Sequence, residues 1–123
     1  MDITDYSGGV PTMVRRWTVA AAMCLLSAVP ALADARSDAR AQVAFGISVA
    51  QRGLWREAIY RWQKAIEIDP RYAPAYNDLA IAYEHEGDLA KAKATYEKAL
   101  ELDPQNAQIQ QNYELFKIGR AHV

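Results

Sequence analysis

The side chains best suited to metal or acid–base chemistry gather around His85, which stands between Glu84 and Glu86 with Asp88 close by. An imidazole and several carboxylates are a common ligand set for a divalent metal ion. However, residues two apart point to different sides of a helix, so this spacing does not converge on one point. The chain also has no His-Glu-x-x-His or EF-hand spacing. We interpret the group as the solvated, acidic end of a helix and expect no bound metal.

Nucleophilic catalysis has few candidate residues in this sequence. The single cysteine, Cys24, lies inside an apolar stretch, and the residues before it resemble the recognition motif of a lipid-accepting cysteine poorly. The second histidine, His122, stands next to the C-terminus. There is no Gly-rich phosphate loop and no Ser-His-Asp set at helical spacing. We therefore expect no enzymatic activity, no cofactor and no small-molecule substrate.

The bulk composition is that of an ordinary small globular protein. The 123 residues are 51% hydrophobic and 24% charged, with a net charge of −1, which leaves room for one small domain. A charge so close to zero creates no long-range field that would attract a polyanion, and no run of Lys or Arg suggests a local one. We expect no nucleic-acid partner.

The N-terminal region has the features of an export signal. Residues 17–33 carry no charge, follow Arg15 and Arg16, and end in Ala31-Leu32-Ala33. A basic start, a short apolar core and an Ala-x-Ala end are typical of a secretory signal peptide. We predict that residues 1–33 are such a signal and that the mature chain, residues 34–123, is periplasmic or secreted. The acidic, turn-like character of residues 1–12 favours a true start at Met13.

The alternative is that residues 17–33 stay uncleaved and anchor the protein in a membrane. A helix needs about 20 apolar residues to cross a bilayer, whereas this segment is shorter and contains Pro30. A membrane is therefore expected as a partner only if cleavage does not occur. Cleavage after Ala33 would leave a chain without cysteine, whose stability rests on helix packing.

An internal repeat reveals the elements that must position any working surface. Two stretches end almost alike, in YRWQKAIEIDPRYAP and ATYEKALELDPQNA, and their prolines, Pro70 and Pro104, are 34 residues apart. The same offset aligns small residues with small and large with large: Phe45 with Leu79, Gly46 with Ala80, Val49 with Tyr83, Gly53 with Gly87, Ala58 with Ala92, Trp62 with Tyr96 and Ala65 with Ala99.

The spacing within each unit predicts two helices packed on each other. Phe45 and Val49 are four apart and lie on one face of a first helix. Ala58, Trp62 and Ala65 give a second helix a small-large-small stripe, and the small residue in the slot of Gly46 lets this helix approach closely.

The boundaries of these helices carry their own signals. Gly53 and Gly87 fall where a helix ends and the chain needs a left-handed turn. Asp88 follows as a predicted N-cap of the next helix. The Asp-Pro pairs at 69–70 and 103–104 end the second helices, because proline disfavours helical geometry in the residue before it.

These features together resemble the tetratricopeptide repeat (TPR). The stretch PAYNDLAIAYEHEGDLAKAKATYEKALELDP is close to a consensus repeat, with Tyr76 in the slot that usually holds Trp. The preceding unit departs more, because Gln42 occupies that slot and Leu54 stands where an acidic cap is usual. A third unit begins at Ala107, puts Tyr113 in the Leu slot and supplies only a first helix, as capping helices of this family do.

The resemblance implies an all-α fold, an α-solenoid of helix-turn-helix hairpins. It places repeats at residues 39–72 and 73–106 and a C-terminal capping helix at residues 107–119. Two repeats and a cap are short for a continuous core, so we expect stabilisation by a partner or by formation of a homo-oligomer.

In this family the first helices of successive repeats line a concave groove that often receives an extended peptide or a helix. Residue by residue, the resemblance assigns to this groove Val43, Ile47, Asn77, Ile81, Gln111 and Leu115. The apolar members offer side-chain pockets, and the two amides can pair with a ligand backbone. The alternative is that these residues only fill space between neighbouring helices.

Chaperone-binding members of the family grip a C-terminal carboxylate with Lys, Asn and Arg side chains. The corresponding residues here are Val43, Ile47, Asp78, Gln108 and Asn112. None is positively charged and one is an acid, so a carboxylate would be unpaired or repelled. We expect no carboxylate clamp.

Two tryptophans belong to the second helix of the first repeat. Trp62 holds the aromatic slot and is predicted to lie in the core. Trp55 follows the turn between the helices, where we expect it to pack half-buried, with an interface anchor as the alternative.

The sequence favours an adaptor that binds a peptide or a protein subunit in the cell envelope through its concave surface. The alternative is a self-associating structural spacer within a larger envelope assembly.

Overall fold

The computed structural model describes residues 31–119 of the chain. The chain divides into two units, Met1–Asp34 and Ala35–Val123, and the second of them holds the packed helices. The predicted signal peptide, residues 1–33, lies outside the described residues apart from its last three. The proposed start at Met13 lies outside them as well.

The described residues form helices joined by short turns. Residues 31–50 are helical and make up the first helix. It is followed by α2 (Trp55–Ile68), α3 (Ala73–His85), α4 (Leu89–Leu102) and α5 (Ala107–Lys117). Residues 31–119 contain no strand, and the predicted all-α class is confirmed.

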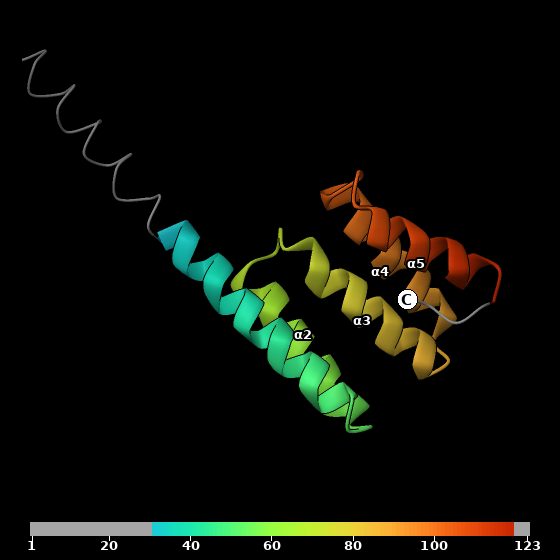
Figure 1. Cartoon of the computed structure of the whole chain (residues 1–123), viewed down its shortest axis with the longest axis horizontal. Coiled ribbons are helices and arrows are strands. Elements are labelled where there is room, and N and C mark those ends of the chain that lie inside the picture. The colour runs from blue at the N-terminus through green and yellow to red at the C-terminus, as the bar shows by residue number, and fades with distance from the viewer. Residues whose placement is uncertain (1–30, 120–123) are drawn as a thin grey trace, which may run out of the picture. The chain divides into compact units, whose positions relative to one another are not determined.

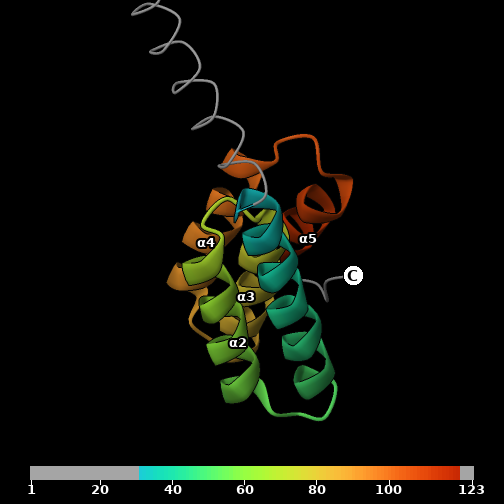
Figure 2. The same cartoon turned by 90° about the vertical axis from the view of Figure 1, so that its left-hand side faces the viewer.

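These helices are arranged as two hairpins and a closing helix (Figure 1). The first helix and α2 lie side by side and are joined by a tight turn, which Figure 2 shows most clearly. Helices α3 and α4 form the second hairpin. Because α3 contacts α2, α4 and α5, it is the central element of the predicted α-solenoid.

The turns within the two hairpins have the same geometry. Gly53 and Gly87 adopt φ angles of 79° and 80°, in the left-handed region that the sequence predicted for them. Asp88 caps α4 as predicted, because its carboxylate accepts a hydrogen bond from the Lys91 N–H at 3.2 Å. Leu54 offers no side-chain cap to α2.

The small-large-small stripe forms the core of each hairpin. Ala58, Trp62 and Ala65 are buried in the first hairpin, and the aligned Ala92, Tyr96 and Ala99 are fully buried in the second. The Trp62 Nε1–H donates to the Val43 carbonyl at 3.2 Å, which ties α2 to the first helix. This contact needs the glycine beside it, because a Cβ at position 46 would overlap the Trp62 ring, 2.8 Å from Cδ1.

Phe45 is far more exposed than Leu79, the residue with which the repeat aligns it. Leu79 is 5% exposed, whereas Phe45 is 47% exposed and lies beneath the Arg61 guanidinium, which is 4.3 Å from the ring centroid. In the second hairpin this slot packs on the hairpin before it. No hairpin within residues 31–119 precedes the first one, so Phe45 is left at an uncovered end.

The closing helix packs on the aromatic core of the second hairpin. The Tyr96 ring centroid lies 5.7 Å from that of Tyr113 and 5.4 Å from that of Phe116. Asn106 caps this helix, because its Oδ1 accepts a hydrogen bond from the Ile109 N–H at 3.1 Å. Helix α5 therefore covers the aromatic side of the second hairpin, at residues where the sequence predicted a further helix.

None of the helices within the described residues is both long and apolar enough to cross a membrane.

Candidate functional site

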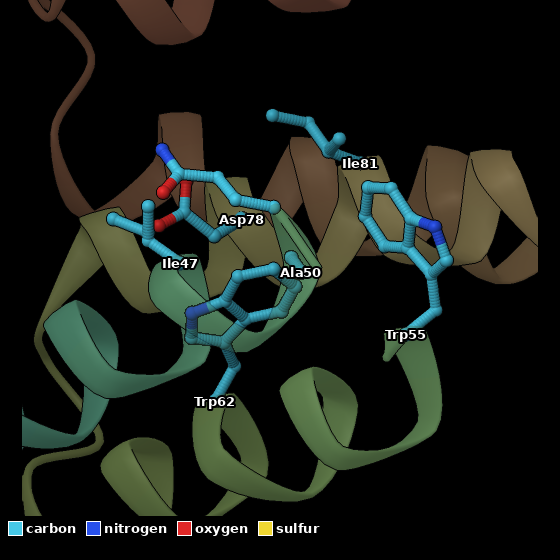
Figure 3. Close-up of a pocket in the computed structure, with 7 residues that line it drawn as sticks. Ile47, Ala50, Trp55, Trp62, Asp78 and Ile81 are labelled. Atoms are coloured by element: carbon cyan, nitrogen blue, oxygen red, sulfur yellow. The ribbon is translucent and has the colours of Figure 1, made fainter. Parts of the chain in front are cut away.

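The first helix, α2 and α3 line an apolar pocket of about 260 Å³ that is open to solvent (Figure 3). We call it the tryptophan pocket. Trp55 and Trp62 reach into it from α2, while Asp78 and Ile81 come from α3. The first helix supplies Ile47 and Ala50, and Gln51 follows at its end.

A second pocket, of about 250 Å³, lies between the first helix, α3 and the start of α5. We call it the amide pocket, because its walls include the side chains of Asn77, Asn106 and Gln108 beside Val43, Tyr72 and Ile109. Ile47 and Asp78 line both pockets, so the two adjoin there. Together they form one groove with an apolar end and a polar end.

Helical spacing explains why these residues converge. Val43 and Ile47 are four apart on the first helix, and Asn77 and Ile81 are four apart on α3, so each pair lies on one face. Because the first helix and α3 are the first helices of successive repeats, these faces border the same groove. The sequence-predicted pairs of the two repeats therefore come together in space.

The six predicted groove residues differ in accessibility. Ile47 is 41% exposed and lines both pockets, and the half-buried Ile81 lines the tryptophan pocket. Val43 and Asn77 line the amide pocket but are 6% and 4% exposed. Gln111 is exposed and Leu115 is half-buried, and neither lines either pocket.

The Asn77 amide is engaged within the protein. Its Oδ1 accepts a hydrogen bond from Asn112 Nδ2 at 3.1 Å, and its Nδ2 donates to Asp78 Oδ1 at 3.2 Å. Asn112 is fully buried, so this amide pair joins α3 to α5 across the core. Asn77 serves as a structural link at the base of the amide pocket, which leaves Gln108 as its exposed amide.

Asp78 was expected from the sequence only as an acid that would repel a ligand carboxylate, and not as a member of the groove. It lies where the two pockets meet, and burial raises the pKa of its carboxyl to about 6. The hydrogen bond from Asn77 opposes this effect without cancelling it. Helical spacing was the available signal, since Asp78 lies three residues before Ile81 and therefore shares its face of α3.

Trp55 is half-buried, as expected, and also forms a wall of the tryptophan pocket. Its indole stacks on the His85 imidazole, with ring centroids 4.1 Å apart and planes at 26°. His85 is exposed at the end of α3, as the sequence predicted, but the ring contact was not foreseen. The stack fixes the Trp55 side chain against α3.

Charge in the groove is negative and comes from one residue. Among the described residues that line the two pockets, none is Lys or Arg, and Asp78 is the single carboxylate. A ligand carboxylate would meet repulsion rather than a basic partner. In addition, no three His, Cys, Asp or Glu residues within residues 31–119 are placed to hold a metal ion together.

Comparison with known protein families decides what kind of chain this is. Residues 73–106 match the family described as tetratricopeptide repeat, and residues 49–87 match the family described as TPR repeat. The chain belongs to the tetratricopeptide repeat family. The matched residues include α2, α3 and α4, and hence one wall of the groove from each hairpin.

Two bacterial relatives extend this similarity beyond the matched repeats. Cellulose synthase operon protein C of Escherichia coli (strain K12) is 37% identical over 89 residues, which is 72% of this TPR chain and 7% of the relative. Type IV pilus assembly protein PilF of Pseudomonas aeruginosa is 38% identical over 79 residues, 63% of this chain and 31% of the relative. This chain therefore spans less than a third of either relative.

A solved structure supports the fold independently. The structure titled "Functional Characterization of Pseudomonas Aeruginosa pilF" superposes with a TM-score of 0.65 at 36% sequence identity. The superposition covers 68% of this chain and 38% of that one. The TPR arrangement of helices is thus shared with an experimentally determined protein.

Proposed function

We propose that this TPR protein is a non-catalytic adaptor of the bacterial cell envelope that receives a peptide or protein subunit in the groove. The observation that carries the proposal is the groove itself. It is open to solvent, lies between the first helices of two repeats, and combines apolar walls with exposed polar groups. This combination suits a polypeptide, which has both a polar backbone and side chains.

The envelope location rests on two supports. The N-terminal sequence has the pattern of a signal peptide with cleavage after Ala33, or of an anchor formed by residues 17–33 if cleavage fails. One relative is named for type IV pilus assembly, and a pilus is a structure of the cell surface. N-terminal sequencing of the protein from fractionated cells tests this location, and recovery of the uncleaved chain in the cytosol would contradict it.

The groove is tested by a charge placed on its walls. Ile47→Glu and Ile81→Glu remove the apolar wall and place a hydrated charge where a large apolar side chain of the partner would be buried, so we expect them to abolish co-purification of the partner from the cell envelope. Leu89→Glu is the matched control, because Leu89 is 58% exposed at the start of α4 and lines neither pocket. Unchanged co-purification by both groove variants, with helicity retained, would contradict the proposal.

A second candidate function is a self-associating spacer. Phe45 is 47% exposed at the uncovered end of the first hairpin, where a second copy could pack. Sedimentation velocity over a wide concentration range separates the two functions. A persistent monomer rules out the spacer, whereas concentration-dependent growth that Phe45→Ser abolishes would favour it.

A further inference from the structure

The Asp78 carboxylate lies at the centre of the groove and has no basic partner among the residues that the structure describes. It takes part in none of the ion pairs within the described residues, and its hydrogen bond comes from the neutral Asn77 amide. The acids on the outer faces of the helices differ, since Glu57, Glu67 and Glu101 each pair with a basic residue on the same helix. A partly buried carboxylate without such a partner is unusual, because burial disfavours its charge.

Among residues 31–119, the elements packed around Asp78 supply no positive charge to the groove. On α4, burial and the nearby Glu84 raise the pKa of the Tyr96 hydroxyl, and the negative charge of Asp78 adds to this shift. Glu84, which accepts a hydrogen bond from the same hydroxyl at 3.1 Å, is also an acid. The first helix and the turn after it contribute Ile47 and the neutral Gln51, and α2 contributes two indole rings.

We propose that Asp78 accepts a Lys or Arg side chain of the bound protein segment, while a large apolar side chain of the same segment enters the tryptophan pocket. This inference rests on the proposed function, in that it names the chemistry of the polypeptide that the groove receives. The polarity is opposite to that of a carboxylate clamp: the groove selects a basic–apolar segment and rejects an acidic one.

Three features of the groove support this assignment. A cation at Asp78 would supply the missing counter-charge at the junction of the two pockets. The indole rings of Trp55 and Trp62 border the same space, and aromatic rings add favourable energy for a nearby cation. The apolar walls of the tryptophan pocket lie on one side of Asp78, and the exposed amide of Gln108 in the amide pocket lies on the other, so an apolar side chain and a peptide backbone can bind on either side of the cation.

The spacing of the recognised residues follows from an extended backbone. Alternate residues of an extended segment point the same way and lie roughly 6.5–7 Å apart. A basic side chain over Asp78 therefore places the residue two positions away above the tryptophan pocket. On the other side, the backbone passes the polar walls of the amide pocket.

The probe is a blocked nonapeptide of Ser and Gly that carries Lys at its fifth position and Leu at its third and seventh. Leucine on both sides lets either chain direction fill the tryptophan pocket. Matched peptides replace the lysine by norleucine or by Glu. Titration into the isotope-labelled full chain, followed by amide NMR shifts, locates the contact and measures millimolar affinities.

We expect the lysine peptide to shift amides of the first helix and α3 and to bind roughly two- to fivefold more tightly than the norleucine peptide. Asp78→Asn should reduce the affinity for the lysine peptide to that of the norleucine peptide. Glu101→Gln makes the same change of charge outside the groove and should leave the affinities for all peptides unchanged. Asp78→Asn should also leave the affinity for the norleucine peptide unchanged, because that peptide carries no cation to pair with Asp78.

Failure of this inference is distinguishable from failure of the proposed function. Equal affinity for the lysine and norleucine peptides, with both weakened by Ile81→Ser, would overturn the role of Asp78 and leave the groove as a peptide site. Tighter binding of the Glu peptide would overturn it too. Absence of groove shifts with every peptide would overturn both proposals.

Discussion

The side chains at positions 42, 76 and 110 occupy one slot of the repeat but end in different surroundings. The Tyr76 hydroxyl donates to the Pro70 carbonyl at 2.8 Å, and Gln110 Nε2 donates to the Pro104 carbonyl at 2.6 Å. Gln42 has no Asp-Pro turn before it, because residues 31–50 are one helix. Its Oε1 is buried without a hydrogen-bond partner among the described residues.

This difference predicts that Gln42→Met stabilises the protein. Methionine keeps the shape of the side chain and removes an unsatisfied polar atom, so the free energy of unfolding should rise by about 1 kcal/mol. Gln110→Met is the matched control, since it removes a hydrogen bond that exists and should lower stability. Urea unfolding followed by circular dichroism measures both, and a loss of stability of equal size in the two variants would contradict the prediction.

The raised pKa of the Asp78 carboxyl predicts that the free energy of unfolding depends on pH. This carboxyl has a pKa raised to about 6, so the folded state binds the proton more tightly than the unfolded state does. Stability contributed by this group is therefore present at low pH and is lost as the pH rises from about 4 to about 6. Asp78→Asn should remove this loss and raise the free energy of unfolding at pH 8 by about 1–2 kcal/mol.

At pH 4 the free energy of unfolding of Asp78→Asn should differ little from that of the natural protein, because the Asp78 carboxyl is already neutral in the folded state. Urea unfolding at pH 4 and pH 8 gives the comparison, with Glu101→Gln as the control for net charge. A gain of the same size at both pH values would show that the carboxylate charge is not its cause. A more stable protein that binds the lysine peptide less well would separate function from folding at this residue.

At the scale of elements, the close contact between the first helix and α2 depends on a glycine. Alanine is the better helix former by roughly 1 kcal/mol, and the second repeat has Ala80 in this slot. However, the ring facing position 46 is the indole of Trp62, which leaves no room for a Cβ. The pair of residues, rather than either one alone, determines how closely the helices approach.

We therefore predict that Gly46→Ala destabilises the protein by roughly 1–3 kcal/mol. In a Trp62→Leu background the clash is removed, and the same change should become neutral or stabilising because of helix propensity. A double-mutant cycle measured by urea unfolding tests this coupling. Additive effects of the two substitutions would contradict a direct clash.

At the scale of the whole molecule, the solenoid has two unlike ends. The C-terminal end is closed by α5, whose aromatic side chains cover Tyr96. The N-terminal end of the first hairpin leaves Phe45 partly exposed, with Arg61 over its ring. Within residues 31–119, α5 thus covers the core of the second hairpin, whereas no described helix covers Phe45.

This asymmetry predicts that Phe116→Ala lowers the free energy of unfolding by roughly 1–3 kcal/mol, because the half-buried ring packs on Tyr96. Ile118→Ala is the matched control on the same segment. Ile118 is 62% exposed, and its truncation should change stability by no more than about 0.5 kcal/mol. Thermal unfolding measures both, and equal effects would show that α5 is not packed as described.

The hairpins were predictable because their signals are local or periodic. Gly53, Gly87 and Asp88 act through their own backbone geometry and nearest turn, which a sequence displays directly. The small-large-small stripes act through helical periodicity, and the offset of 34 residues shows that the two units share one packing. The second repeat and the start of α5 follow from the same reasoning.

The groove was predictable only in part, for a physical reason. Neighbouring helical residues point about 100° apart, so a small difference in how two helices pack decides which of them faces the ligand side. Asn77 was predicted for the groove and is committed to Asn112, whereas the adjacent Asp78 lies at its centre. Gln111 and Leu115 were assigned by the repeat pattern, yet α5 contributes its start to the amide pocket instead.

The repeat, its helix boundaries and the helices that border the groove follow from the sequence alone, since they depend on short-range geometry and periodicity. The folded structure was needed to show that Trp55 stacks on His85, that Phe45 stays partly exposed, and that Asp78 lies between two pockets without a positive partner among the described residues. The exposure of a side chain and the presence of a counter-charge depend on which side chains of other helices lie nearby. The spacing of residues within one helix does not predict these contacts.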